Sequence, residues 1–358
     1  MNIKSLLLGS AAALAVVSGA QAADAIVAAE PEPMEYVRVC DAFGTGFFYI
    51  PGTETCLKIS GEVRVNVAFG EDRNIFTPSF TEDDKNWDSS VRARVNFEAR
   101  NDSELGTIGS FIRLQGSDTG SVEVEQAYIT VGGFKVGYFT TFVDDFGLAG
   151  ESDFFFTQTK NVAASYTYAS DAFTVGFGID DLTDFYEGGS GVIDATGDNE
   201  IGLEAMVSAS FGVASLAVYG AYDIEASEGA VGAVISAEVG PGTLAVAGAY
   251  SSGINAYTNP DLDTPLDVNH VAQWAIGAAY SFKATDKLTL TAAANYYGDY
   301  LFIEDLGGDK INAWSADLLA EYALAEGLKA SANIRYTDFD ADGADAEWDG
   351  FVRLTRSF

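Results

Sequence analysis

The stretch Ile59-Ser-Gly-Glu-Val-Arg-Val-Asn-Val-Ala-Phe69 alternates between two kinds of side chain along its whole length. Its odd-numbered positions carry Ile, Gly, Val and Phe, whereas its even-numbered positions carry Ser, Glu, Arg, Asn and Ala. A period of two is the spacing at which successive side chains of a β-strand point to opposite faces. The stretch therefore predicts a strand with one apolar face and one charged face.

The same alternation recurs to the end of the chain. In the second segment, valine, alanine and phenylalanine share one parity, while Arg92, Arg94 and Arg100 share the other. Strands of soluble β-sandwiches are shorter, about 5–6 residues, so this alternative is disfavoured. Sixteen segments follow the pattern: 58–69, 89–100, 106–116, 121–132, 133–140, 160–169, 171–180, 198–211, 213–223, 229–239, 242–252, 270–283, 286–298, 311–323, 326–337 and 347–358.

The connections between these segments also alternate, between long and short. Long ones at 141–159, 181–197, 253–269 and 299–310 alternate with tight turns at 132–133, 211–212, 240–242 and 285–286, although 117–120 and 224–228 are shorter than the pattern requires. Outer-membrane barrels have short periplasmic turns and long external loops, and use about 20 residues per strand with its connection. The fold class predicted for 58–358 is therefore all-β, a transmembrane antiparallel β-barrel of about sixteen strands.

Aromatic residues at matching parity give the height of the lipid-facing band. Trp348 and Phe358 lie ten residues apart, which corresponds to roughly 25 Å along the membrane normal for a tilted strand. Trp314 with Tyr322 is a closer pair of the same kind. This spacing fits the apolar band of an outer-membrane barrel.

The N-terminal residues have the pattern of an export signal. Lys4 precedes an apolar run from Leu6 to Val17, and Ala20-Gln21-Ala22 forms an A-x-A cleavage site. The apolar run is shorter than the roughly 20 residues that cross a bilayer as a helix. Residues 1–22 are therefore predicted to be a signal peptide that is removed on export to the periplasm.

The next segment, 23–57, contains both cysteines of the chain, Cys40 and Cys56. In the oxidising periplasm an even pair favours a disulfide bond, which contributes about 3 kcal/mol when it closes a loop of about 15 residues. The alternative is a pair of free, buried thiols.

The charge balance excludes nucleic acid as a partner. Acidic residues outnumber basic ones 53 to 19, giving a formal net charge of −34, whereas proteins that bind phosphate backbones neutralise them with Lys and Arg. With 48% hydrophobic and 13% aromatic residues, the chain is also far too apolar to be disordered. The charge is therefore expected on loops or in a lumen.

The sequence contains no recognisable catalytic or cofactor-binding motif. The only histidine is His270, and hydrolytic catalysis usually needs a His base held by partners. The run Asp338-Phe-Asp-Ala-Asp-Gly343 has the spacing of a calcium loop, but strands flank it instead of helices. We expect no enzymatic activity, no cofactor and no metal site.

Three longer motifs carry a family resemblance. They are the stretches from Pro31 to Gly61, from Val124 to Tyr138 and from Trp348 to Phe358. Together they closely resemble the porins of alphaproteobacteria such as rhizobia and brucellae. The resemblance implies a homotrimer in the cell outer membrane, surrounded by lipid and lipopolysaccharide, with a constriction loop, loop 3, folded into each lumen. It also implies passive diffusion of small hydrophilic solutes and ions. The alternatives are an adhesin or surface-anchoring barrel and a barrel hydrolase.

Charged residues on the early strands and in the long connection 141–159 predict a constriction. Arginines share the lumen parity of the first three segments, and acidic residues follow the fifth, so the two sets would create a transverse field across the pore. The residues assigned to it are Arg64, Arg92, Arg94, Arg113, Asp144, Asp145, Glu151 and Asp153. The alternative is an ordinary polar lumen without special pairing. Because the acidic loops attract cations to the mouth, a weak cation preference is expected.

Overall fold

The computed structural model describes residues 38–70, 87–118, 120–151, 155–156, 160–187, 200–258, 272–300, 311–340 and 346–358. Residues Val39–Phe358 form one compact unit. The predicted signal peptide of 1–22 lies outside the described residues, as do His270, Asp153 and positions 341–345 of the calcium-like run. The signal peptide stays a prediction.

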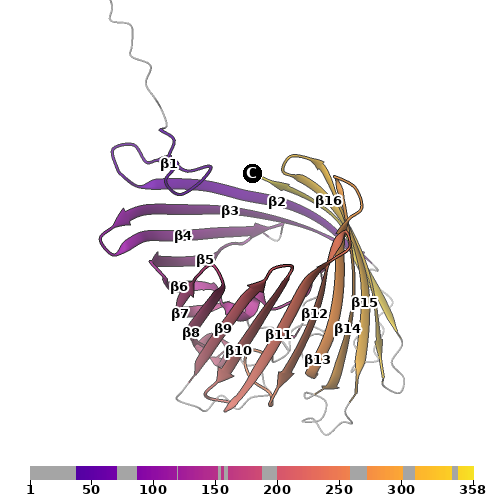
Figure 1. Ribbon diagram of the computed structural model, residues 1–358. Helices are drawn as coiled ribbons and strands as arrows, with labels where there is room; N and C mark the ends of the chain where they lie inside the picture. Colours follow the sequence, from indigo (N-terminus) through magenta and orange to yellow (C-terminus); the bar gives the residue numbers. More distant parts are fainter. Residues whose placement is uncertain are drawn as a thin grey trace, which may run out of the picture. The chain divides into compact units, whose positions relative to one another are not determined.

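Within the described residues, sixteen long strands pair antiparallel in chain order, and the last pairs with the first, which closes the barrel (Figure 1). The strands are β2 (Cys56–Gly70), β3 (Trp87–Ser103), β4 (Gly106–Ser117), β5 (Val122–Val131), β6 (Phe134–Thr140), β7 (Lys160–Ala169), β8 (Phe173–Asp181), β9 (Ile201–Phe211), β10 (Ala214–Asp223), β11 (Glu228–Val239), β12 (Gly242–Ser251), β13 (Ala272–Lys283), β14 (Leu288–Tyr300), β15 (Ala313–Ala325), β16 (Leu328–Phe339) and β17 (Glu347–Ser357). The predicted fold class is confirmed, and each strand overlaps one predicted segment, with ends that differ by up to three residues.

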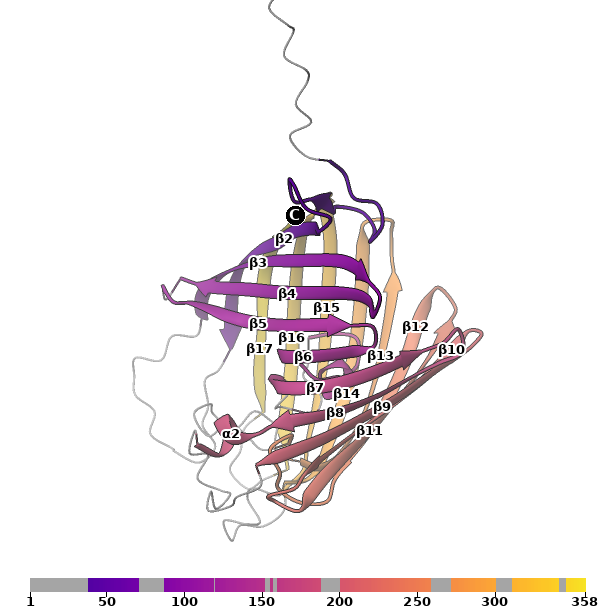
Figure 2. The same ribbon diagram turned by 90° about the vertical axis from the view of Figure 1, so that its left-hand side faces the viewer.

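The two parities of each strand lie on the two faces of the barrel wall. On β2, Val63 and Val65 are 42% and 43% exposed on the outer face, whereas Glu62 and Arg64 make ion pairs on the inner face. Because outward-facing side chains of a membrane barrel contact lipid, an apolar outer face is the stable arrangement. Figure 2 shows β3 to β6 in front, with β14 to β16 behind them on the far wall.

Aromatic side chains form a belt on the outer face near one end of β13 to β17. The rings of Trp314 and Tyr336 lie 5.1 Å apart, and those of Tyr336 and Trp348 lie 4.8 Å apart. At the other end of the wall, Tyr322 and Phe358 are exposed on the same face. Aromatic girdles of this kind lie at the two membrane interfaces of outer-membrane barrels.

The long and short connections lie at opposite ends of the barrel. The described parts of the long connections contain two short helices: η1 (Phe142–Asp145) follows β6, and α2 (Thr183–Glu187) follows β8. Neither helix of the described part of the chain has the length and apolar composition needed to span a membrane. By the usual asymmetry, the end with the long connections is the external one.

A disulfide bond joins Cys40 and Cys56, whose Cα atoms are 6.0 Å apart. It ties the segment before the barrel to the first residue of β2, and the short strand β1 (Phe48–Tyr49) pairs with the same part of β2. Phe47 packs against the buried bridge. The predicted bridge is confirmed.

We therefore expect the purified protein to be unreactive toward thiol reagents until it is reduced. Unreduced protein treated with iodoacetamide and analysed by mass spectrometry should carry no label, and reduced, unfolded protein should carry two. Full labelling without reduction would show that the thiols are free in the exported protein.

Candidate functional site

The connection between β6 and β7, residues 141–159, is here called loop 3, and it turns into the lumen directly after the short strand β6. Its described residues are 141–151 and 155–156. The backbone N–H groups of Phe142 and Val143 donate hydrogen bonds of 2.7 and 3.4 Å to Oε2 of Glu204, which lies on the inner face of β9. Glu204 therefore anchors the start of loop 3 to the wall.

Loop 3 then follows the inner wall closely. A Cβ atom added to Gly232 of β11 would lie 2.6 Å from the Phe146 ring, and one added to Gly277 of β13 would lie 2.7 Å from Leu148. At distances this short, an added Cβ would force the Phe146 ring or the Leu148 side chain to shift. The glycines thus mark the track along which loop 3 crosses the strands.

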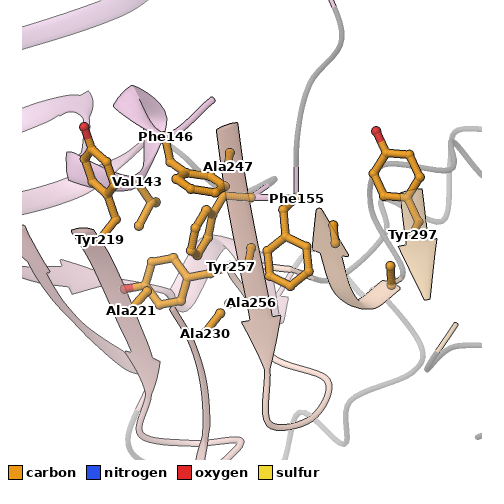
Figure 3. Packing of buried hydrophobic residues seen from close by; sticks show 14 of the residues in the cluster. Val143, Phe146, Phe155, Tyr219, Ala221, Ala230, Ala247, Ala256, Tyr257 and Tyr297 are labelled. Atoms are coloured by element: carbon orange, nitrogen blue, oxygen red, sulfur yellow. The ribbon is translucent and has the colours of Figure 1, made fainter. Parts of the chain in front are cut away.

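Apolar packing holds the middle of loop 3 in place (Figure 3). Val143, Phe146 and Phe155 are buried together with Tyr219 of β10 and Ala247 of β12. The centroid of the Phe146 ring lies 5.9 Å from that of Tyr219. Small side chains on the inner wall therefore leave the space that the loop side chains fill.

An ion pair holds loop 3 at Glu151, where its first described stretch, 141–151, ends. Glu151 accepts hydrogen bonds of 2.9 and 2.8 Å from Nη1 of Arg353 on β17. Beside it, Gly150 lies close to Oδ1 of Asp317 on β15, at 3.2 Å from the position of an added Cβ. Loop 3 therefore spans the lumen from β9 to β17.

Two further carboxyl groups on neighbouring strands hold other connections inside the barrel. Asp180 of β8 accepts a 2.5 Å hydrogen bond from the Tyr257 hydroxyl. Asp223 of β10 accepts bonds of 2.7 Å from the Tyr186 hydroxyl and 2.9 Å from the Ala256 N–H. The inner wall of β8 to β10 is thus a row of acidic anchors, of which Glu204 is the middle one.

The predicted arginines lie together on the inner wall of β2 to β4, and each has an acidic neighbour. Glu62 lies between Arg92, at 2.7 Å, and Arg64, at 3.6 Å. Glu125 of β5 is 6% exposed and lies 3.4 Å from Arg94 and 3.3 Å from Arg113.

Lys160, at the start of β7, also lies 3.3 Å from Glu125. The Glu125 carboxylate therefore forms ion pairs with three cations, so the wall around it has an excess of positive charge.

The acidic residues of η1 face solvent in the lumen. Asp144 and Asp145 are both exposed. Although its side chain is exposed, the surrounding protein partly desolvates Asp145 and raises its pKa above the ordinary value; the neighbouring Asp144 raises it further, and Lys135 of β6 opposes the shift. Within the described ranges, no group of three His, Cys, Asp or Glu side chains is placed to hold a metal ion.

Sequence reasoning placed Arg64, Arg92, Arg94 and Arg113 on the lumen face, and the structure brings them together. It missed their partners Glu62 and Glu125, and it missed Arg353, the partner of Glu151. The alternation of each strand could have placed Glu62 and Arg353 on the lumen face, because their neighbours in the sequence are valines and a leucine that face outward. Whether the eight assigned residues form the constriction stays a prediction.

The chain is similar to known proteins over its full length. A family model described as "Porin subfamily" matches residues 24–352. The chain is 42% identical to "Putative outer membrane protein y4fJ" of Sinorhizobium fredii, over 100% of this chain and 99% of the relative. It is 35% identical to "Porin Omp2a" of Brucella suis biovar 1, over 100% of both chains.

Solved structures show a similar fold at low sequence identity. The outer membrane channel DcaP of Acinetobacter baumannii has a TM-score of 0.63 and 15% identity, covering 87% of this chain and 99% of that chain. The trimer form of OmpT, an outer membrane protein of Vibrio cholerae, has a TM-score of 0.61 and 16% identity, covering 86% of this chain and 100% of that chain.

Proposed function

Because the chain belongs to the porin subfamily and forms a channel in the outer membrane, we propose that loop 3 and the arginine wall together form its constriction. The observation that carries the proposal is the course of loop 3 through the lumen, from its anchor at Glu204 to the Glu151–Arg353 ion pair. Charges at a constriction select ions and orient dipolar solutes. Asp144 and Asp145 on the loop and the arginines of β2 to β4 supply charges of opposite sign.

The electrostatics support a weak preference for cations. Glu62 and Glu125 neutralise part of the arginine wall, whereas Asp144 and Asp145 make no ion pair with the described residues. The chain as a whole carries a net charge of −34, which attracts cations to the mouth. At about 1 M salt the screening length falls to roughly 3 Å, so the preference should fade as salt is added.

Recording single channels in planar bilayers tests the proposal. We expect stepwise, ohmic conductance, with reversal potentials under a KCl gradient that indicate cation preference. A barrel that does not conduct would favour the surface-anchoring alternative. Anion preference in the unmodified channel would show that the arginine wall governs selectivity.

Replacing Asp144 and Asp145 together with Asn should weaken the cation preference and raise the passage of anionic solutes. Both carboxylates are exposed in the lumen, and their removal takes two negative charges from the loop side of the constriction. Reversal potentials measure the effect. Lowering the pH should act in the same direction, because the raised pKa of Asp145 lets its carboxylate become neutral at a higher pH than an ordinary Asp.

An unchanged reversal potential in the double Asn variant would show that η1 does not line the conducting path. Asp180 and Glu204 line the same cavity as Asp145 and Lys135. The pH series is therefore repeated in the double Asn variant, where any remaining response belongs to other groups.

We propose further that the functional unit is a homotrimer embedded in lipid and lipopolysaccharide. The support is the trimer form of OmpT, whose fold this chain shares, and the apolar outer face with its aromatic belt. A single insertion into a bilayer should then close in three equal steps. Insertions that close in one step would indicate a monomeric channel.

We also propose that the small hydrophilic solutes and ions pass unchanged, without catalysis. The chain carries a single histidine, and hydrolytic barrels usually need a His base with an orienting partner. Release of fatty acids or cleaved peptide by the purified protein would contradict this.

A further inference from the structure

A cavity of about 380 Å³ lies between η1 of loop 3 and the inner wall of β6 to β9. This volume is within the range of sites that bind small molecules. Thr167 and Thr174, which line it, flank the tight turn between β7 and β8, so the cavity lies on the periplasmic side of loop 3. A solute that passes the constriction reaches this cavity next.

Lys135 supplies a positive charge that no acidic residue neutralises directly. Its ammonium group lies 3.9 Å from the centroid of the Phe139 ring and makes no ion pair with any residue of the described ranges. The arginines of β2 to β4, by contrast, lie beside Glu62 or Glu125. An aromatic ring stabilises a cation while leaving its N–H donors available to a ligand.

Asp145 supplies the complementary negative charge from η1. Its carboxylate lines the same cavity, and no side chain in the described part of the structure pairs with it. The two groups interact electrostatically but do not form an ion pair with each other. A ligand with both charges would contact both groups, whereas a simple anion or cation would be attracted by one and repelled by the other.

The rest of the lining is partly acidic, partly polar and partly apolar. The carboxyl groups of Asp180 and Glu204 also line the cavity, where they accept hydrogen bonds from the Tyr257 hydroxyl and the Phe142 N–H. Ser165, Thr167 and Thr174 offer hydroxyl groups, and Phe139 and Met206 offer an apolar surface. Hydroxyl groups both donate and accept hydrogen bonds. The lining therefore suits a small dipolar solute with an apolar side chain.

We propose that this cavity is a binding site for zwitterionic α-amino acids, with the carboxylate at Lys135, the ammonium at Asp145 and the side chain against Phe139 and Met206. The proposal rests on the channel function, since the solute must enter through the lumen. Weak binding here raises the local concentration of the solute beside the constriction. The flux of such a solute would therefore saturate, unlike that of an unbound solute.

Current recordings on the full protein with L-leucine as the probe test the site. Binding of leucine next to the constriction should block the ionic current through the channel transiently. Leucinamide, which lacks the carboxylate, and N-acetyl-leucine, which lacks the ammonium, should each bind about tenfold or more weakly, because each loses one charge-assisted contact. Equal blocking by glucose, leucinamide and leucine would overturn the proposal.

Variants locate the block within the lumen. Lys135→Met and Asp145→Asn should each weaken leucine block about tenfold. The swapped variant, Lys135→Asp with Asp145→Lys, should recover binding, because it keeps both charges. The matched control is Lys329→Met, which removes a lysine that pairs with Glu321 elsewhere in the barrel, and it should leave the block unchanged.

The outcomes separate the site from the channel itself. The Lys135→Met and Asp145→Asn variants could show normal conductance steps and be blocked by leucine as strongly as the unmodified protein. That result would overturn the binding site and leave the channel function intact. If Lys135→Met does not assemble, the Asp145→Asn variant alone tests the site, because the Asp145 side chain lies on the exposed surface of loop 3 and its substitution should not disturb folding. An unmodified protein without conductance steps would instead refute the channel.

Discussion

Replacing Glu125 with Gln reverses the ion preference of the channel from cations to anions. Glu125 lies within 3.4 Å of Arg94 and within 3.3 Å of Arg113 and Lys160, so one substitution leaves three cations without their shared counter-charge. A single charge at 4 Å changes the potential by about 1 kcal/mol even in water. That is about fivefold in the local concentration of each ion, in opposite directions for cations and anions.

Reversal potentials under a KCl gradient measure the change. Strand pairing should survive, because Arg94 also bonds Gln115 and Arg113 also bonds Asn96. The matched control is Glu321→Gln, which removes a lumen carboxylate that pairs with Lys329 on β16. A shift of equal size in both variants would show that only the total lumen charge matters, and not its place in the arginine wall.

Removing both anchors of loop 3 widens the channel. Glu204→Leu leaves the N–H groups of Phe142 and Val143 without their acceptor, which costs about 1–3 kcal/mol for each buried donor. Arg353→Met breaks the ion pair with Glu151 at the other end. We expect the double variant to show larger conductance steps and to admit larger neutral solutes, while each single variant shows a smaller effect with more current noise.

Liposome swelling with neutral sugars of increasing size measures the cut-off alongside the recordings. The control is Glu204→Gln, whose amide oxygen still accepts the two backbone hydrogen bonds, and it should resemble the unmodified channel. Assembly of each variant is checked by heat-modifiable migration in electrophoresis. An assembled double variant with unchanged steps would show that loop 3 does not limit the pore.

The period of two is sufficient to predict the barrel, because alternation is a local property of the chain. The outward direction of Val63 and Val65 and the inward direction of Glu62 and Arg64 follow from the alternation of apolar and polar residues over positions 59–69. Strand ends follow from the turn residues in the same way. The lumen face of the arginines was therefore predictable from the sequence.

Contacts across the lumen were not predictable, because they join residues that are far apart in the chain. Glu151 meets Arg353 across 202 positions, and Tyr257 meets Asp180 across 77. Parity assigns a side chain to a face but does not say which other strand it reaches. Gly232 lies within a predicted strand, and only the course of loop 3 shows that a Cβ there would meet the Phe146 ring.

The position of η1 in the conducting path is tested most directly by placing a charge on it. Cys40 and Cys56 are bridged, so Asp144→Cys introduces the one free thiol of the chain, and a cationic methanethiosulfonate can modify it while current is recorded. The matched control, Asp171→Cys, places the thiol in the turn between β7 and β8. We predict that modification at position 144 lowers the conductance step and shifts the reversal potential toward anion preference, whereas the control does neither. Complete modification at position 144, established by mass spectrometry, with conductance and reversal potential unchanged would show that loop 3 does not form the constriction.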